Sequence, residues 1–246
     1  MFDYTAPDQL LKNRVILITG AGDGIGRAAA IDSARLGATV ILLGRTIEKL
    51  EVVYDEIENA GYPQAAIYPL DLRFATDEDY ISLAQVVEDE FGGLDGLVHN
   101  ASILGQRTPL SNYESRTWNL VMQVNATAPF MMTQALLPLL EVSKDASIIF
   151  TSSSVGAQGK AYWGAYSVSK FATEGMAQIL ADETGNTSKI RVNIIDPGAT
   201  RTSMRAQAYP GENPAQNPLP KDIMPVYQYL LGPDSLGITG QRFKAQ

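Results

Sequence analysis

The sequence predicts an α/β fold with one domain, residues 1–246, in which helices cover both faces of a doubly wound parallel sheet. Short apolar runs alternate with longer segments whose apolar residues recur at helical spacing, the pattern of strands joined by helical crossovers. A glycine-rich stretch lies between the first run and the first helical segment. No linker, repeat or low-complexity tract divides the chain, and 246 residues fit a single domain.

The predicted elements follow one another as strand-helix units. The first three strands are expected at residues 15–19, 39–43 and 65–70, and the helices after them at 25–36, 46–60 and 76–91. The next elements are strand 96–100, helix 115–142, strand 147–152, helix 166–184 and strand 191–195, with a last strand at 238–243. Four prolines interrupt the pattern between residues 203 and 220, so we expect this segment to be an irregular substrate lid.

The composition argues against several classes of function. The formal net charge is −8 and the pI is near 4.7, so the chain lacks the basic excess of a nucleic-acid binder. With no Cys and one His, it has no thiolate ligands and few imidazoles for a metal. Residues 1–10 do not resemble a signal peptide, and no apolar stretch reaches the ~18 residues that span a membrane. We therefore expect a cytoplasmic protein without a nucleic-acid, metal or membrane partner.

The glycine-rich stretch, residues 19–26, predicts a dinucleotide-binding loop of the Rossmann type. Its glycines allow a tight turn and a close approach of the backbone to a pyrophosphate, and the next helix presents its N-terminal N–H groups. The loop opens the first strand-helix unit at the carboxyl edge of the sheet, where such folds bind dinucleotides. Taken alone, the loop is equally consistent with a tight connection.

The end of the second strand indicates which dinucleotide binds. An NAD site carries a carboxylate about 20 residues after the loop, whereas this chain has Gly44 and Arg45 there. The guanidinium of Arg45 suits the 2′-phosphate of NADP, so NADP is predicted over NAD. Two alternatives stay open: Arg45 is only a solvated residue before the Thr46 cap, or Asp23 in the loop repels the phosphate.

Tyr166, Lys170 and Ser153 are the candidate catalytic residues. Tyr166 and Lys170 are four residues apart on one helix face, and Ser153 follows a strand that ends at the same sheet edge as the glycine loop. A phenol can give a proton to a carbonyl oxygen as hydride arrives, or take one from an alcohol as hydride leaves. We expect Lys170 to lower the pKa of Tyr166, by up to ~3 units, and Ser153 to bind the substrate oxygen. A hydrolase built on His99 is disfavoured, because the sequence has no nucleophile-elbow serine.

These residues resemble the short-chain dehydrogenase/reductase family over nearly the whole chain, and more narrowly its YciK-type oxidoreductases. The matching segments are residues 19–26, Asp71, Asn100-Ala101, Asn125, Ser153, residues 166–170 and residues 193–198. The resemblance implies a Rossmann-type fold and adds Asn125 to Ser153, Tyr166 and Lys170 as a fourth catalytic residue. It also implies cofactor contacts at Gly20, Asp23, Gly24, Ile25, Gly26, Asp71, Leu72, Asn100, Ala101, Tyr166, Lys170, Pro197, Gly198 and Thr202, beside Arg45.

The chain departs from the family pattern at two positions of the Asn-Asn-Ala-Gly motif. His99 replaces the first Asn and Ser102 replaces the Gly, which affects the local turn; we expect His99 to be structural. Pro129 is a second unusual feature, because without an N–H it leaves the Asn125 carbonyl without its helical donor. We expect a kink there and an ordered water on that carbonyl, which by the resemblance would relay protons through Lys170 to Tyr166.

The sequence thus predicts an NADP-dependent oxidoreductase acting on a small carbonyl or alcohol substrate. The alternatives are an NAD-dependent dehydrogenase of the same fold and a catalytically silent cofactor-binding regulator, against which the intact Ser153, Tyr166 and Lys170 argue. A homodimer or homotetramer is expected because helices 115–142 and 166–184 carry an apolar excess, although all of it could instead pack on the sheet. The apolar residues concerned are Met131, Met132, Leu136, Leu137, Phe171 and Met176.

Overall fold

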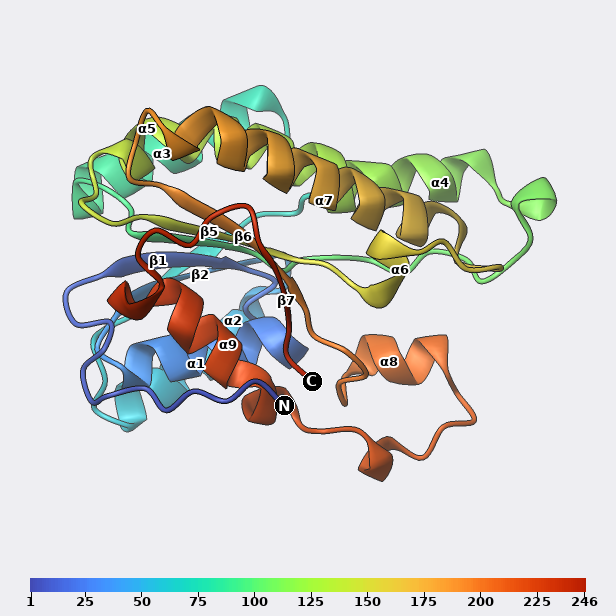
Figure 1. Cartoon of the computed structure of the whole chain (residues 1–246), viewed down its shortest axis with the longest axis horizontal. Coiled ribbons are helices and arrows are strands. Elements are labelled where there is room, and N and C mark those ends of the chain that lie inside the picture. The colour runs from blue at the N-terminus through green and yellow to red at the C-terminus, as the bar shows by residue number, and fades with distance from the viewer.

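A seven-stranded parallel sheet forms the centre of the computed structural model, which describes residues 1–246 (Figure 1). The strand order is β3-β2-β1-β4-β5-β6-β7, and every neighbouring pair is parallel. The strands are β1 (Val15–Thr19), β2 (Thr39–Gly44), β3 (Ala66–Pro69), β4 (Gly96–His99), β5 (Ser147–Thr151), β6 (Arg191–Asp196) and β7 (Arg242–Lys244). The order reverses between β1 and β4, so the predicted doubly wound fold is confirmed, with the ligand-binding crevice expected outside the carboxyl ends of these two strands.

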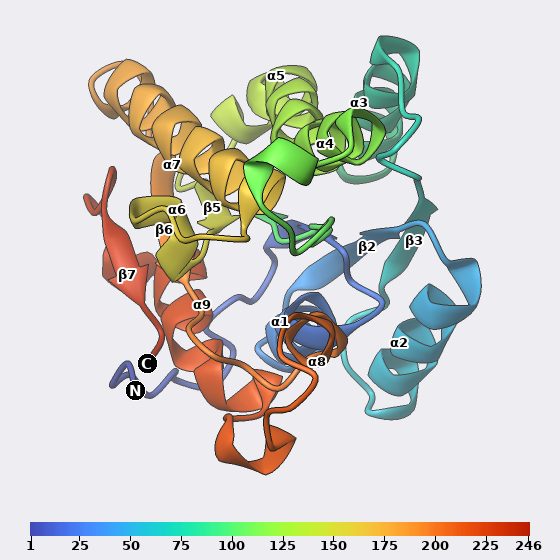
Figure 2. The ribbon, with the colours of Figure 1, turned by 90° about the vertical axis from the view of Figure 1, so that its right-hand side faces the viewer.

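Helices cover both faces of the sheet (Figure 2). One face carries α1 (Gly24–Arg35), α2 (Ile47–Asn59) and α9 (Met224–Leu231), and the other carries α3 (Asp77–Phe91), α4 (Ser115–Met122), α5 (Ala128–Glu141) and α7 (Gly164–Gly185). The inner strands β1, β2, β4 and β5 are mostly apolar because both of their faces are buried. In β1, Ile16 and Ile18 join one core cluster while Leu17 joins the other, as the alternation of a strand requires. None of the helices combines the length and apolar character needed to cross a membrane.

The segment predicted to be an irregular lid contains a helix, so that prediction was wrong in part. Helix α8 (Ser203–Ala208) occupies its first third, and 3₁₀ turns follow at Pro214–Gln216 and Pro220–Ile223. The side chain of Thr202 caps α8 by accepting the N–H of Arg205 at 3.1 Å, and the first proline of the segment, Pro210, comes only after the helix has ended. Helix α9 was not predicted; its Pro225 lies in the first turn, where proline is tolerated.

The long helix predicted at 115–142 is divided as Pro129 leads one to expect. Between α4 and α5, residues Gln123–Thr127 form a π-helical turn in which Ala128 N–H bonds to the carbonyl of Gln123. The carbonyl of Asn125 accepts a hydrogen bond from the hydroxyl of Thr173, on α7, at 3.1 Å. The interruption at Asn125 is therefore confirmed, but a side-chain donor already serves its carbonyl, which weakens the argument that a water must bind there.

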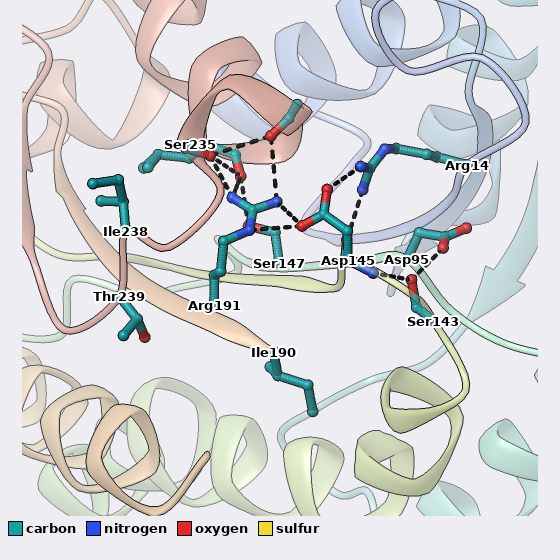
Figure 3. Close-up of polar contacts among 12 residues, drawn as sticks. Arg14, Asp95, Ser143, Asp145, Ser147, Ile190, Arg191, Ser235, Ile238 and Thr239 are labelled. Atoms are coloured by element: carbon teal, nitrogen blue, oxygen red, sulfur yellow. Dashed lines mark hydrogen bonds and ion pairs between the residues drawn. The ribbon is translucent and has the colours of Figure 1, made fainter. Parts of the chain in front are cut away.

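A network of charged side chains ties together the amino ends of the strands, at the edge of the sheet opposite to the crevice (Figure 3). The buried Arg191, at the start of β6, donates to Asp145 at 2.8 Å and to the carbonyl of Leu230 at 2.8 Å. Arg14, before β1, donates to the backbone carbonyl of Asp145 at 2.8 Å and also pairs with its carboxylate. The network joins β1, β5, β6 and the end of α9, and so fixes the sheet from which the crevice is built.

Candidate active site

A cavity of about 750 Å³ opens at the carboxyl edge of the sheet, where the strand order reverses. Its walls come from segments that are far apart in the sequence: the glycine loop, the ends of β2, β3, β4 and β5, the start of α7, the loop after β6, and α8. All the predicted site residues line it except Gly26 and Asn125, which lie behind its wall. The structure therefore brings together nearly the whole set of residues selected from the sequence.

The glycine loop packs too closely for a side chain at Gly26, and Gly20 and Gly24 adopt a backbone conformation that side chains disfavour. A Cβ on Gly26 would lie 2.3 Å from the carbonyl oxygen of Gly20 and 2.6 Å from the side-chain amide of Asn100. Only glycine therefore lets the start of α1 pack against the backbone of Gly20. Gly20 and Gly24 have φ angles of 69° and 55°, in the left-handed region that favours glycine. The loop thus forms a cradle of backbone N–H groups at the N-terminus of α1, the arrangement that binds a pyrophosphate.

The altered motif at the end of β4 keeps a well-defined turn. The hydroxyl of Thr19, at the end of β1, accepts the backbone N–H groups of Asn100 at 2.9 Å and of Ala101 at 3.0 Å. The side chain of Asn100 donates to the carbonyl of Thr19 at 3.2 Å. The replacement residue His99 is buried, bonds Thr133 at 2.8 Å and stacks on Phe150, and burial lowers its pKa to about 3. His99 is thus a neutral structural residue, as expected.

Arg45 lies exposed in the lining of the cavity, which also contains two carboxylates that are already paired, Asp71 and Asp23. Arg73 beside Asp71 holds the pKa of that carboxyl below its usual value, with a smaller contribution from Arg45. Burial raises the pKa of Asp23, but hydrogen bonds from Lys49, at 3.0 Å, and from Ser203 outweigh it, and the net shift is downward. Lys49, which the sequence reasoning missed, therefore offsets the repulsion that Asp23 would exert on a phosphate.

Tyr166 and Lys170 emerge from α7 into the cavity beside Ser153. The ammonium of Lys170 donates to the carbonyl of Thr151 at 2.7 Å and lies 5.6 Å from the centre of the Tyr166 ring. Burial raises the pKa of Tyr166 to about 12, against the opposing effect of the Ser153 hydroxyl, and burial lowers the pKa of Lys170 to about 8.

The expected lowering of the Tyr166 pKa by Lys170 is therefore not found. Desolvation of the phenolate dominates, and the ammonium is held by a backbone carbonyl over the face of the ring. Tyr166 is a phenol at neutral pH in this structure. It is thus in the form that can give a proton, which is the form that carbonyl reduction requires.

Asn125 does not line the cavity; it holds the loop after β4. Its carboxamide accepts the N–H of Ile103 at 2.8 Å and donates to the carbonyl of the same residue at 3.0 Å. A third bond, also 3.0 Å long, reaches the hydroxyl of Ser169 on α7, which in turn donates to the carbonyl of Tyr166 at 2.8 Å. Asn125 therefore couples the position of this loop to the helix that carries Tyr166.

Strand β7 holds groups next to the site through hydrogen bonds of Arg242, a contribution that was not predicted from the sequence. Arg242 donates to Glu174 at 3.0 Å, to Asp196 at 3.0 Å and to the backbone carbonyl of Ser153 at 3.0 Å. Glu174, one turn after Lys170, is buried and also accepts the hydroxyl of Ser152. The pairing partners lie 46 to 89 residues apart, and no local pattern indicates such contacts.

One end of the cavity is apolar and is lined in part by α8. Leu104, Val155, Trp163 and Tyr166 form a buried cluster, against which Met204, Ala208 and Tyr209 pack. Arg107, from the loop after β4, donates to the carbonyl of Ala208 at 2.8 Å, and its guanidinium lies 4.2 Å from the centre of the Trp163 ring. Tyr162 is exposed, and neither Tyr162 nor Tyr209 lines the cavity itself. No group of three or more His, Cys, Asp or Glu residues is arranged to hold a metal ion.

Comparisons with known proteins show which family this chain is similar to. A family model described as short chain dehydrogenase matches residues 14–213. The uncharacterized oxidoreductase YciK of Escherichia coli (strain K12) is 53% identical over 99% of this chain and 96% of its own length. A protein of Pseudomonas syringae described as a short chain dehydrogenase is 61% identical, with a TM-score of 0.99 over 100% of both chains. A structure from E. coli CFT073, complexed with NADPH, is 54% identical, with a TM-score of 0.94 over 98% of this chain and 100% of that one.

Proposed function

This chain belongs to the short-chain dehydrogenase/reductase family of oxidoreductases, and from that premise we propose that it transfers a hydride between NADP(H) and a small carbonyl or alcohol substrate. The observation that carries the proposal is the single cavity that Ser153, Tyr166 and Lys170 share with the glycine loop and Arg45. A proton donor thereby lies in the same space as a site for a dinucleotide.

The residues present fit a phosphorylated dinucleotide. The close packing around Gly20 and Gly26 leaves bare backbone at the start of α1, which suits a pyrophosphate. Arg45 and Lys49 supply two cations at the rim where the 2′-phosphate of NADP would lie, and no carboxylate stands at residue 45 to bind a free ribose hydroxyl. A relative that is 54% identical has been crystallised with NADPH. When bound, the nicotinamide supplies or accepts the hydride.

Tyr166 is proposed to be the general acid of reduction. As hydride reaches the carbonyl carbon, the phenol proton moves to the carbonyl oxygen, and an alcohol and a phenolate result. Ser153 donates a hydrogen bond to the same oxygen and holds it within reach of the phenol. Lys170, whose ammonium is held by the carbonyl of Thr151, lies over the Tyr166 ring and keeps a positive charge near the reacting groups. In the reverse direction the phenolate removes the alcohol proton.

The pKa of Tyr166 sets the pH dependence of each direction. Because burial raises the pKa to about 12, the phenol is nearly fully populated at pH 7, and proton supply does not limit reduction. Alcohol oxidation needs the phenolate, so its rate is expected to rise as the pH approaches the pKa from below. The proposed activity is accordingly more efficient as reduction near neutral pH.

The direct test is NADPH consumption by the purified protein against a panel of aldehydes, ketones, quinones and 3-oxo esters, with NADH in parallel. The proposal expects turnover of at least one carbonyl compound, faster with NADPH at equal concentration. Tight NADPH binding without turnover of any panel member would favour the catalytically silent regulator. Equal rates with the two cofactors would favour an NAD-dependent dehydrogenase.

A further inference from the structure

Ser102 has a buried hydroxyl group without a hydrogen-bond partner, and it lies at the active site. Four side-chain polar atoms of the chain are buried and unpaired: Tyr80 Oη, Ser102 Oγ, Trp163 Nε1 and Arg201 Nε. Of these residues, Ser102 and Trp163 line the cavity that holds Tyr166. A buried polar group that forms no bond destabilises the fold, so its position at a reaction site points to a partner that appears during the reaction.

The backbone on both sides of Ser102 is fixed. Ala101 donates its N–H to the Thr19 hydroxyl at 3.0 Å, and Ile103 is held at both its N–H and its carbonyl by the side chain of Asn125. Between these two anchors the loop cannot shift Ser102 away from the cavity without breaking these three hydrogen bonds. The Ser102 hydroxyl therefore stays in the lining of the cavity that also contains Tyr166.

We propose that the Ser102 hydroxyl donates a hydrogen bond to the oxygen of Tyr166 whenever that oxygen is a phenolate, and that Ser102 is a positioning residue for proton transfer. The inference rests on the proposed function and deepens it. When the phenol proton has moved to the substrate oxygen, the Tyr166 oxygen carries a negative charge inside a buried site. The hydroxyl of Ser102, which has no other acceptor, then donates a hydrogen bond to this oxygen and stabilises its charge.

The groups around Tyr166 divide into those that favour the phenolate and those that oppose it. Burial is the largest effect and raises the pKa; the hydroxyl of Ser153 lowers it, the carboxylate of Asp196 raises it, and the hydroxyl of Ser102 lowers it. Lys170 lies over the ring at 5.6 Å from its centre. Ser102 thus forms no hydrogen bond of ordinary geometry with the phenol, yet lies close enough to favour the phenolate.

The sequence pattern gives this hydroxyl its significance. The family motif that residues 99–102 resemble has glycine at the last position, and this chain has serine there. With glycine, the hydroxyl of Ser153 would have to serve both the substrate oxygen and the Tyr166 oxygen. Ser102 gives the Tyr166 oxygen a second hydroxyl, so Ser153 is free to bind the substrate.

The test is the pH dependence of kcat/KM for alcohol oxidation with NADP⁺ in four variants. Ser102→Ala and Ser102→Gly remove the hydroxyl, Ser102→Thr keeps it, and Ser111→Ala is a matched control in an exposed part of the same loop. A hydrogen bond to an ion is stronger than one to its neutral form, so the two hydroxyl-free variants should hold less phenolate at every pH below the pKa of Tyr166. We expect their kcat/KM for oxidation to fall roughly tenfold between pH 8 and pH 10. Ser102→Thr and the Ser111 control should keep the wild-type kcat/KM over this range.

An unchanged kcat/KM between pH 8 and pH 10 in both Ser102→Ala and Ser102→Gly would overturn the proposal, as would a change in KM with kcat unaltered, which would place the hydroxyl on the substrate instead. A second measurement separates this outcome from failure of the proposed function. The Cζ resonance of Tyr166 in ¹³C-tyrosine-labelled protein, assigned with Tyr166→Phe, reports the phenolate fraction at pH 11 without any substrate. If the wild type turns over no alcohol or carbonyl, the proposed function fails. A smaller phenolate fraction in Ser102→Ala would still support the Ser102 contact, and an equal fraction would refute it.

Discussion

Replacement of Arg45 by alanine is expected to weaken NADPH binding and to leave NADH binding nearly unchanged. The guanidinium is the charged group that stands where a carboxylate would select NAD, and it lies exposed at the cavity rim. Charged hydrogen bonds contribute about 1.5 to 3 kcal/mol. Because solvent screens an exposed group, we expect the lower end of this range, and about 1.4 kcal/mol corresponds to a tenfold change in Kd.

Lys49 is expected to affect the Kd for NADPH as well. Its bond to Asp23, 3.0 Å long, keeps a carboxylate neutralised near the expected phosphate position. Arg45→Ala should therefore raise the Kd for NADPH about tenfold, and Arg45→Ala combined with Lys49→Met should raise it by more, because Asp23 then repels the phosphate. Titration calorimetry with NADPH and NADH measures both effects, with Arg35→Ala, an equal loss of charge on α1 outside the cavity, as control. An unchanged NADPH Kd in Arg45→Ala, or an equal loss for NADH, would refute the reasoning.

Three further predictions concern the support of the site and its surroundings. Arg242→Met should lower the free energy of unfolding by about 3 kcal/mol in urea titrations, because the buried carboxylates of Glu174 and Asp196 lose their partner, and should lower kcat because the Ser153 backbone is released; no change in either would contradict this role. Pro129→Ala should let the α-helical bond to the Asn125 carbonyl form and should slow turnover more than it weakens NADPH binding; equal losses would argue against it. A symmetric dimer or tetramer is expected in ultracentrifugation at micromolar concentration, since Phe130 and Phe171 are 52% and 44% exposed on α5 and α7; a monomer would defeat it.

Strands and most helices could be predicted from the sequence because their signal is local. The apolar run of β1 was placed without error, and the other strands differ from expectation by a few residues at their ends. Helix α8 was missed because the prolines of its segment lie downstream of it, and the average composition hid the capped turn at Thr202. The strand predicted at 238–243 begins only at Arg242, because pairing with β6 decides where it starts.

The meeting of Ser153, Tyr166 and Lys170 could also be predicted, since parallel strands place their carboxyl ends at one edge. The pKa of Tyr166 could not, because it depends on burial by α8 and the loop after β4, which spacing along one helix does not reveal. Which apolar residues of the outer helices are exposed could not be predicted from the sequence either. Met132 and Leu136 pack on the sheet, whereas Phe171 on the neighbouring helix stays exposed.

The central claim is that Tyr166 transfers the proton, and Tyr166→Phe tests it most directly. The variant keeps the ring and the shape of the cavity but removes the hydroxyl, so NADPH should bind with a Kd within a few-fold of wild type. Single-turnover NADPH oxidation with the best carbonyl of the panel should fall by at least roughly a hundredfold, the usual contribution of a general acid. A wild-type-like rate in Tyr166→Phe, with NADPH binding intact, would contradict the account.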